Sequence, residues 1–208
     1  MSESNGITVT GSGTVTAAPD TATVDLGVSV LAPTATEAAG AAAHAATELV
    51  EALTSSGIDR ADISTSRYSL AAEYDWTESG RRDLGYRAQN TVRARLKDLS
   101  TVGAVIDAVV AAAGDTVTVN GLEFSVADRV AALAEARAAA WADVMARAGQ
   151  LAELAGVALG RPVEVVESEG WTPPPSPKML RMEAASVTPV EPGTLEVTAT
   201  IRARFRID

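Results

Sequence analysis

The sequence predicts an α+β protein: a largely antiparallel sheet with about three helices packed on one side, in the order β-β-α-β-β-α-β-α-β-β. Two observations predict this class. Runs rich in β-forming residues come in adjacent pairs separated by segments with helical signals. In addition, apolar and polar residues alternate strictly through the final stretch, Leu195–Asp208. Because strand side chains point to opposite faces with period two, this stretch is expected to be a long half-buried strand.

The first two β-rich runs are Ile7–Thr16 and Ala22–Val30, and Ala17–Asp20 between them carries a turn signal. We therefore expect a hairpin. Gly11–Gly13 in the first run indicates a bulge or a close approach of backbone. Thr34–Glu37 then fits a capping box, in which a hydroxyl and a carboxylate satisfy free amides at a helix start. An Ala-rich helix follows and is expected to end near Gly57.

A second hairpin is expected from Ile63–Trp76 and Leu84–Lys97, around the polar loop Thr77–Asp83. Asp98 is placed to cap a second helix, which covers Leu99–Ala113 and stops at Gly114.

The segment Val117–Val126 changes its alternation at Asn120–Gly121, which indicates either a bulged strand or a tight hairpin. The bulged strand is favoured because each arm is short. Asp128 is expected to cap the third and longest helix, which reaches about Ala155 with Leu133, Ala140, Trp141, Val144, Ala148 and Leu151 facing inward. A strand over Pro162–Ser168 and the terminal strand complete the fold.

Composition bounds the class of protein. The 208 residues suit one large domain or two intimately packed ones. A single domain is expected over residues 7–208, with a flexible N-terminus at 1–6 and a Pro-rich loop at 170–193. A net charge of −10 argues against nucleic-acid binding and against attachment to anionic membranes. With no cysteine, disulfides and thiolate metal sites are excluded.

The expected location follows from the start of the chain. Met1–Gly6 is polar and shows no export signal, so the chain as written is expected to be cytoplasmic, or in the envelope or secreted if a leader was removed. Apolar stretches such as Val102–Ala113 look too short for membrane insertion.

Several stretches, in order along nearly the whole chain, carry a family resemblance. They are Ile7–Asp20, Tyr86–Asp98, Asn120–Asp128 and the end of the chain from Pro189 through Leu195–Ile201. Together they resemble the SIMPL-domain family, which includes YggE-like and periplasmic immunogenic protein-like members. The resemblance implies a sheet-plus-helices fold and a role in the cell envelope, the stress response or protein interaction. It carries no catalytic residues, so none is transferred.

Basic side chains on two strands form the sharpest local feature. One face of each strand carries three of them: Arg93, Arg95 and Lys97 on the first, and Arg202, Arg204 and Arg206 on the second. If these strands are neighbours, like charges would stand opposite one another unless something anionic covers them. Such a face could bind an anionic ligand or an acidic partner. The favoured alternative is a solvated sheet face balanced by Asp25, Glu196 and other strand carboxylates.

The Pro-rich segment Trp171–Met182 is the second candidate. Its prolines favour an extended conformation, and its apolar residues Trp171, Pro174, Met179, Leu180 and Met182 could dock on a neighbouring subunit or partner. The alternative is a long loop within a hairpin.

The remaining candidates are weak. His44 is the only histidine, is expected to be exposed, and has no ligand-spaced companions, so no metal site is expected. Carboxylates in the polar loop lack the burial that acid–base chemistry needs. The aromatic residues of the second hairpin, Tyr68, Tyr74, Trp76 and Tyr86, could form a packing cluster across the strands.

We therefore expect a non-enzymatic, self-associating interaction or scaffold protein, without a cofactor. A homo-oligomer is expected, with a further protein partner as a second kind of contact. The alternative is a small module that binds anions on an Arg-rich sheet face.

Overall fold

The computed structural model describes residues 5–78, 80–171 and 188–207, and the side chains of these residues except 169–171. They form two compact units. The four-stranded unit comprises residues 20–125 with 188–192, and the three-stranded unit comprises 5–19, 126–171 and 193–207. The element order matches the expected one, so the α+β class is confirmed. The expectation of a single domain stays a prediction, which the cooperativity of unfolding would test.

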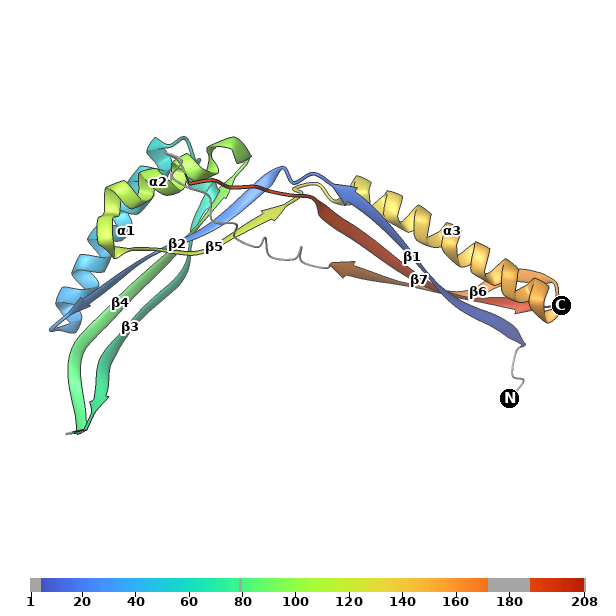
Figure 1. Ribbon diagram of the computed structural model, residues 1–208, viewed down its shortest axis with the longest axis horizontal. Coiled ribbons are helices and arrows are strands. Elements are labelled where there is room, and N and C mark those ends of the chain that lie inside the picture. The colour runs from blue at the N-terminus through green and yellow to red at the C-terminus, as the bar shows by residue number, and fades with distance from the viewer. Residues whose placement is uncertain (1–4, 79, 172–187, 208) are drawn as a thin grey trace. The chain divides into compact units, whose positions relative to one another are not determined.

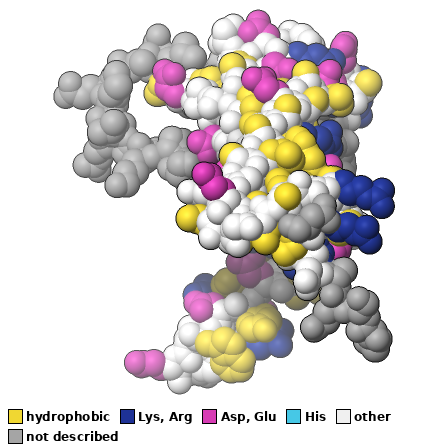
Figure 2. All heavy atoms as spheres, turned by 90° about the vertical axis from the view of Figure 1, so that its right-hand side faces the viewer, with side chains coloured by type: hydrophobic (Ala, Val, Ile, Leu, Met, Phe, Trp, Pro, Cys, Tyr) yellow, Lys and Arg dark blue, Asp and Glu magenta, His cyan; other side chains and the backbone are white. Residues whose placement is uncertain are grey.

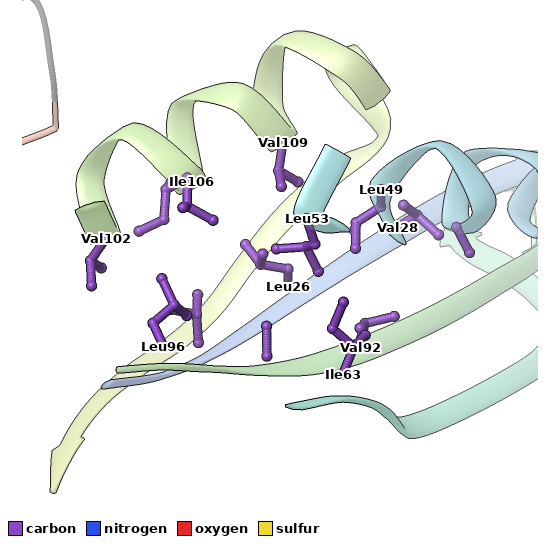
Figure 3. Packing of buried hydrophobic residues seen from close by; sticks show 14 of the residues in the cluster. Leu26, Val28, Leu49, Leu53, Ile63, Val92, Leu96, Val102, Ile106 and Val109 are labelled. Atoms are coloured by element: carbon purple, nitrogen blue, oxygen red, sulfur yellow. The ribbon is translucent and has the colours of Figure 1, made fainter. Parts of the chain in front are cut away.

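In the four-stranded unit, an antiparallel sheet in the order β3-β4-β2-β5 lies under two helices. Its elements are β2 (Thr21–Ala32), α1 (Ala35–Ser55), β3 (Ile63–Thr77), β4 (Gly80–Leu96), α2 (Val102–Ala113) and β5 (Val117–Ser125). Both helices cover the same face of the sheet (Figure 1). Large branched side chains fill the space between them, Leu26 and Val92 from the sheet and Leu49, Leu53 and Val109 from the helices (Figure 3).

Helix α1 begins as its sequence predicts. The Thr34 hydroxyl accepts a hydrogen bond from the Glu37 amide, and the Glu37 carboxylate accepts one from the Thr34 amide, both at 3.2 Å. Two free amides of the first turn are thereby satisfied, and the capping box is confirmed.

Helix α2 ends as predicted but begins later than expected. The Asp98 carboxylate accepts a hydrogen bond from the Ser100 amide and caps the 3₁₀ turn Leu99–Thr101, and α2 itself begins at Val102. Gly114 ends the helix with a positive φ of 57°. By length and composition alone, residues 99–116 could cross a membrane. Here Val102, Val105 and Ile106 are buried in the core of the unit, and core helices pass the same test.

The three-stranded unit packs α3 (Val130–Ala155) on an antiparallel sheet in the order β1-β7-β6. Its strands are β1 (Gly6–Ala17), β6 (Leu159–Trp171) and β7 (Leu195–Ile207). Small residues at four-residue spacing line the buried face of α3: Ala136, Ala140, Val144, Ala148 and Ala152. A Cβ added at Gly13 would lie 2.2 Å from the Ala136 carbonyl oxygen, so the predicted close approach of backbone is confirmed.

One residue of α3 was placed wrongly by the sequence pattern. Leu151, expected to face inward, is 45% exposed, and Ala152 lies against the sheet instead. The helix sits so near β1 that only small side chains fit beneath it, and the buried stripe therefore follows the alanines rather than the leucines. The Asp128 carboxylate accepts a 2.9 Å hydrogen bond from the Val130 amide, close to its predicted capping role.

The predicted hairpin between the first two strands is wrong. β1 pairs along its whole length with β7, whereas β2 pairs with β4 and β5. The Ala17–Asp20 connection thus joins strands of two different sheets, and the one expected sheet is divided into two. Alternation of apolar residues specifies which face of a strand is buried, but it does not specify the partner strand.

The other strand predictions hold. β3 and β4 form the second hairpin, but its turn is tighter than expected, because Thr77 pairs with Gly80 and Tyr74 pairs with Asp83. β5 is a single strand whose register shifts opposite Asp25 and Leu26, so the bulged strand is confirmed.

Candidate interaction surfaces

The two predicted basic rows lie in different sheets. Arg93, Arg95 and Lys97 belong to β4 and its end, and β4 pairs with β2 and β3. Arg202, Arg204 and Arg206 belong to β7, which pairs with β1 and β6. The two rows are therefore not on neighbouring strands, and no single face of one sheet carries all six cations.

On the four-stranded sheet, carboxylates neutralise the basic row. Arg93 donates from Nε and Nη2 to the two carboxylate oxygens of Asp25, at 2.9 Å each, and this pairing raises the pKa of Arg93. Arg95 and Lys97 both donate to Asp62, with Arg95 Nη2 at 2.6 Å and Lys97 Nζ at 2.8 Å. Hydrogen bonds from Lys97 and Arg95 hold the pKa of Asp62 below its usual value.

A further ion pair continues this pattern toward the hairpin. Arg87 donates to both carboxylate oxygens of Glu73 and to the hydroxyl of Ser29. The bond from Arg87 lowers the pKa of Glu73. The uncovered face of the four-stranded sheet is thus a charge-balanced, solvated surface, in which the balancing role expected of Asp25 is observed.

The basic row on β7 has different surroundings. Arg202 and Arg204 stand opposite Thr10 and Thr8 of β1, and Glu164 of β6 stands opposite Arg204. Within the described residues, no ion pair involves Arg202 or Arg206, both of which are exposed. Arg202 and Arg206 thus stand outside the ion pairs of the described residues, with Thr10 and Val166 opposite Arg202.

The predicted interaction loop falls almost wholly outside the described residues. Pro174, Met179, Leu180 and Met182 belong to residues 172–187, which the structure does not describe. Trp171 is the last residue of β6 and pairs with Val197, and its side chain is likewise outside the description. The docking role of this loop stays a prediction.

Sequence reasoning missed the surface along β3, which is an outer strand of its sheet. Four large side chains at even positions are exposed there: Tyr68 (56%), Leu70 (40%), Tyr74 (49%) and Trp76 (71%). We call them, with Ala72 between them, the β3 stripe. The period-two spacing was visible in the sequence, but the tight turn and the outer position of β3 were not, so the aromatic residues were assigned to packing.

The aromatic contacts run along one strand rather than across the hairpin. Tyr74 and Trp76 meet edge to face with ring centroids 6.3 Å apart, and the Arg81 guanidinium lies 4.4 Å from the centroid of Tyr74. Near the turn of the hairpin, the lowest part of the view in Figure 2, hydrophobic and charged side chains lie side by side at the surface.

No cluster of metal ligands is seen in the described part of the chain. No group of three or more His, Asp or Glu side chains there could hold a metal ion. His44 is exposed, as expected, with its Nε2 3.5 Å from a carboxylate oxygen of Glu48.

Known proteins are similar to this chain along most of its length. Residues 7–205 match the family described as SIMPL, a protein of unknown function (DUF541). The 26 kDa periplasmic immunogenic protein of Brucella melitensis is 30% identical over 97% of this chain and 84% of the relative. The uncharacterized protein YggE of Escherichia coli K12 is 29% identical over 97% of this chain and 80% of the relative.

The matched region spans both structural units and contains all the stretches on which the resemblance was based. The chain therefore belongs to the SIMPL family.

Proposed function

We propose that this chain is a non-enzymatic, self-associating interaction protein of the cell envelope. The observation that carries the proposal is the exposure of large apolar side chains on an outer strand of each sheet. On β3 these are the residues of the stripe, and on β6 they are Val163 (47%), Val165 (53%) and Val166 (47%). Proteins usually protect outer strands with charges, bulges or short lengths, so long apolar ones favour a partner.

The backbone of an outer strand adds to the attraction. One side of β3 is paired with β4, and its other side carries no strand in the described part of the chain. The amides and carbonyls on that side can be satisfied by a strand from another chain, while alternate side chains supply apolar contact. A second copy offers such a strand at equal concentration, which supports self-association.

The ionisable groups support a non-enzymatic role. Five carboxyl groups of the described chain have clearly shifted pKa values, and all five are lowered by hydrogen-bond donors: Asp62, Glu73, Asp98, Asp107 and Asp143. A general acid or base works best with a pKa near the operating pH, which for a carboxyl group requires a raised value. These carboxylates serve as acceptors that hold the fold together.

The envelope location rests on a relative. The Brucella relative is named as a periplasmic protein, whereas no comparison supports the cytoplasmic expectation. A link to the stress response stays a prediction from the family resemblance.

Light scattering on a sizing column, at low and high salt, tests self-association. We expect a multiple of 21.3 kDa that survives high salt, because apolar contacts are weakly screened. Leu70→Lys and Val165→Lys place a charge on each outer strand, and at least one of them should lower the mass. Leu154→Lys is the matched control, since Leu154 is 77% exposed on α3 and belongs to neither strand. A monomer at high concentration would overturn the proposal.

A second candidate function is anion binding by the β7 row. It is favoured by the contrast between Arg202 and Arg206, which have no ion pair in the described chain, and the paired cations of β4. Phosphate or sulfate should then raise the melting temperature beyond the effect of chloride at equal ionic strength. Arg202→Ala should abolish this increment and Arg93→Ala should not. Equal melting temperatures in all three salts would exclude the site.

A further inference from the structure

The part of β3 that follows its bulge is an uninterrupted run of residues with one residue at its midpoint. The register between β3 and β4 shifts at Ser66, and from Arg67 to Thr77 β3 continues without an extra residue of its own. The later shift between Glu73 and Tyr74 leaves its extra residue, Leu84, on β4. Ala72 is the midpoint of Arg67–Thr77, with five residues on each side.

The β3 stripe is symmetric about the same point. Leu70 and Tyr74 are two residues from Ala72, and Tyr68 and Trp76 are four residues from it. Because side chains alternate with period two along a strand, all five lie on one face. Every residue of β3 after Ile63 is at least partly exposed, so the described chain leaves this strand uncovered.

We propose that two copies of this chain pair through β3, antiparallel, about a two-fold axis at Ala72. This inference rests on the proposed self-association and adds the strand and the register. Leu70 then stands opposite Tyr74 of the second copy, and Tyr68 stands opposite Trp76 of the second copy. The small Ala72 faces its own counterpart on the axis, and the two sheets join into one.

Other registers use the stripe less well. With the axis at Leu70, Tyr74 would stand opposite Ser66 of the second copy, which is the bulge, and Trp76 would stand opposite Ser64 of the second copy. Both partners lie before Arg67, outside the regular part of β3. An axis at Tyr74 would place Tyr68 opposite Gly80, past the end of β3. Only the axis at Ala72 sets all four large side chains against one another, and aromatic and aliphatic cross-strand pairs are the favourable ones.

The opposite face of β3 is compatible with this register. Ser69 stands opposite Asp75 of the second copy, and Ala71 stands opposite Glu73 of the second copy, so no like charges are directly opposed. The two Glu73 carboxylates are diagonal neighbours, and Arg87 of its own chain neutralises each one.

The symmetry favours a second copy over an unrelated partner. A two-fold interface needs a surface that is complementary to itself, in which residue i meets residue j and j meets i. With Ala72 on the axis, every large side chain of the β3 stripe has another large side chain opposite it, whereas binding of an unrelated peptide would not require such even spacing about one residue.

Single-cysteine cross-linking tests the register, since the chain has no cysteine. Opposed residues of antiparallel strands have Cα atoms about 4.5–5.5 Å apart, which lies within the disulfide range. Ala72→Cys should therefore form a disulfide-linked dimer under mild oxidation. In Ala71→Cys, the two thiols are diagonal rather than opposed, so dimer formation should be slower by roughly tenfold. Melting by circular dichroism confirms that each variant is folded.

The outcomes separate the two proposals. Rapid cross-linking of Ala72→Cys with slow cross-linking of Ala71→Cys supports the two-fold pairing. Equal rates, in a protein whose mass by light scattering is a multiple of the chain, would overturn the β3 register and leave self-association standing. A monomer by light scattering would overturn both. A mixture of Leu70→Cys and Tyr74→Cys, which should cross-link faster than either alone, tests the same register off the axis.

Discussion

Both units pack helix on an antiparallel sheet, but the side chains between helix and sheet are large in one unit and small in the other. In the four-stranded unit, large branched residues such as Leu26, Leu49 and Val92 separate the helices from the strands. In the three-stranded unit, alanines of α3 rest directly on Gly11 and Gly13 of β1. The first arrangement is stabilised mainly by the apolar area that it buries, and the second by the closeness of its backbones.

This difference predicts opposite sensitivities. A core of large side chains is most vulnerable to deletion of atoms, because a cavity remains. A core of small side chains has little to delete but no room for addition, because the added atom meets backbone.

Removing a large side chain from the four-stranded unit should have the greatest effect. Leu49 is fully buried, so Leu49→Ala should lower the free energy of unfolding by about 2–5 kcal/mol. Chemical denaturation measures the loss, and hydrogen exchange should locate it within residues 20–125. Val110→Ala on α2, where Val110 is 45% exposed, should change little. Equal loss of protection in both units would show that they unfold together.

Adding one methyl group should be enough to damage the three-stranded unit. In Gly13→Ala the new Cβ meets the backbone of Ala136 and Ala140 at 2.2 and 2.4 Å, so α3 must move, at a cost of about 1–3 kcal/mol. In Gly149→Ala the new Cβ meets nothing within 4 Å, and the change should be neutral or stabilise by up to about 1 kcal/mol. Similar denaturation midpoints for the two variants would contradict the close-packing argument.

Removing the side chain that caps a helix should cause a smaller loss of stability, and the loss should differ between α1 and α3. Thr34→Ala removes both bonds of the Thr34 hydroxyl, the one that it accepts from the Glu37 amide and the one that it donates to the Glu37 carboxylate, and should destabilise the four-stranded unit by about 1 kcal/mol. Asp128→Ala removes the bond that its carboxylate accepts from the Val130 amide, so its cost should be lower. Denaturation of both variants checks the order, and a larger loss for Asp128→Ala would reverse it.

The two units should also differ in how much stability they lose in acid, and this is the smallest of the expected effects. Donors lower the pKa of Asp62 and Asp107 in the four-stranded unit, and of Asp143 in the other. Because a lowered pKa means that the folded state binds fewer protons, this stability is present above the unfolded pKa of about 4 and is lost as pH falls through the folded values.

Hydrogen exchange from about pH 5 to about pH 3 should therefore show greater loss of protection in the four-stranded unit, which also holds Glu73 and Asp98. Asp62→Asn should reduce the pH dependence. A greater loss in the three-stranded unit would refute the assignment.

Local chemistry made much of the fold predictable. The capping box at Thr34, the stop at Gly114 and the bulge near Asn120 each depend on a few adjacent residues, and all three are observed. The alternation in β7 likewise depends only on the period of a strand. Helix and strand limits are local properties, so one sequence is enough to predict them.

Strand partners depend on tertiary structure instead. β1 pairs with β7, from the opposite end of the chain, and α3 covers the face of β1 that carries Gly11 and Gly13. The same dependence decided the candidate surfaces: it divided the six basic residues between two sheets and placed Tyr68, Leu70, Tyr74 and Trp76 on an outer strand. The sequence by itself determined the order of the elements and most of their buried faces, with Leu151 of α3 as an exception, since these follow from short-range periodicity. Only the tertiary structure decided which edges stay open, because exposure depends on residues far apart in the chain.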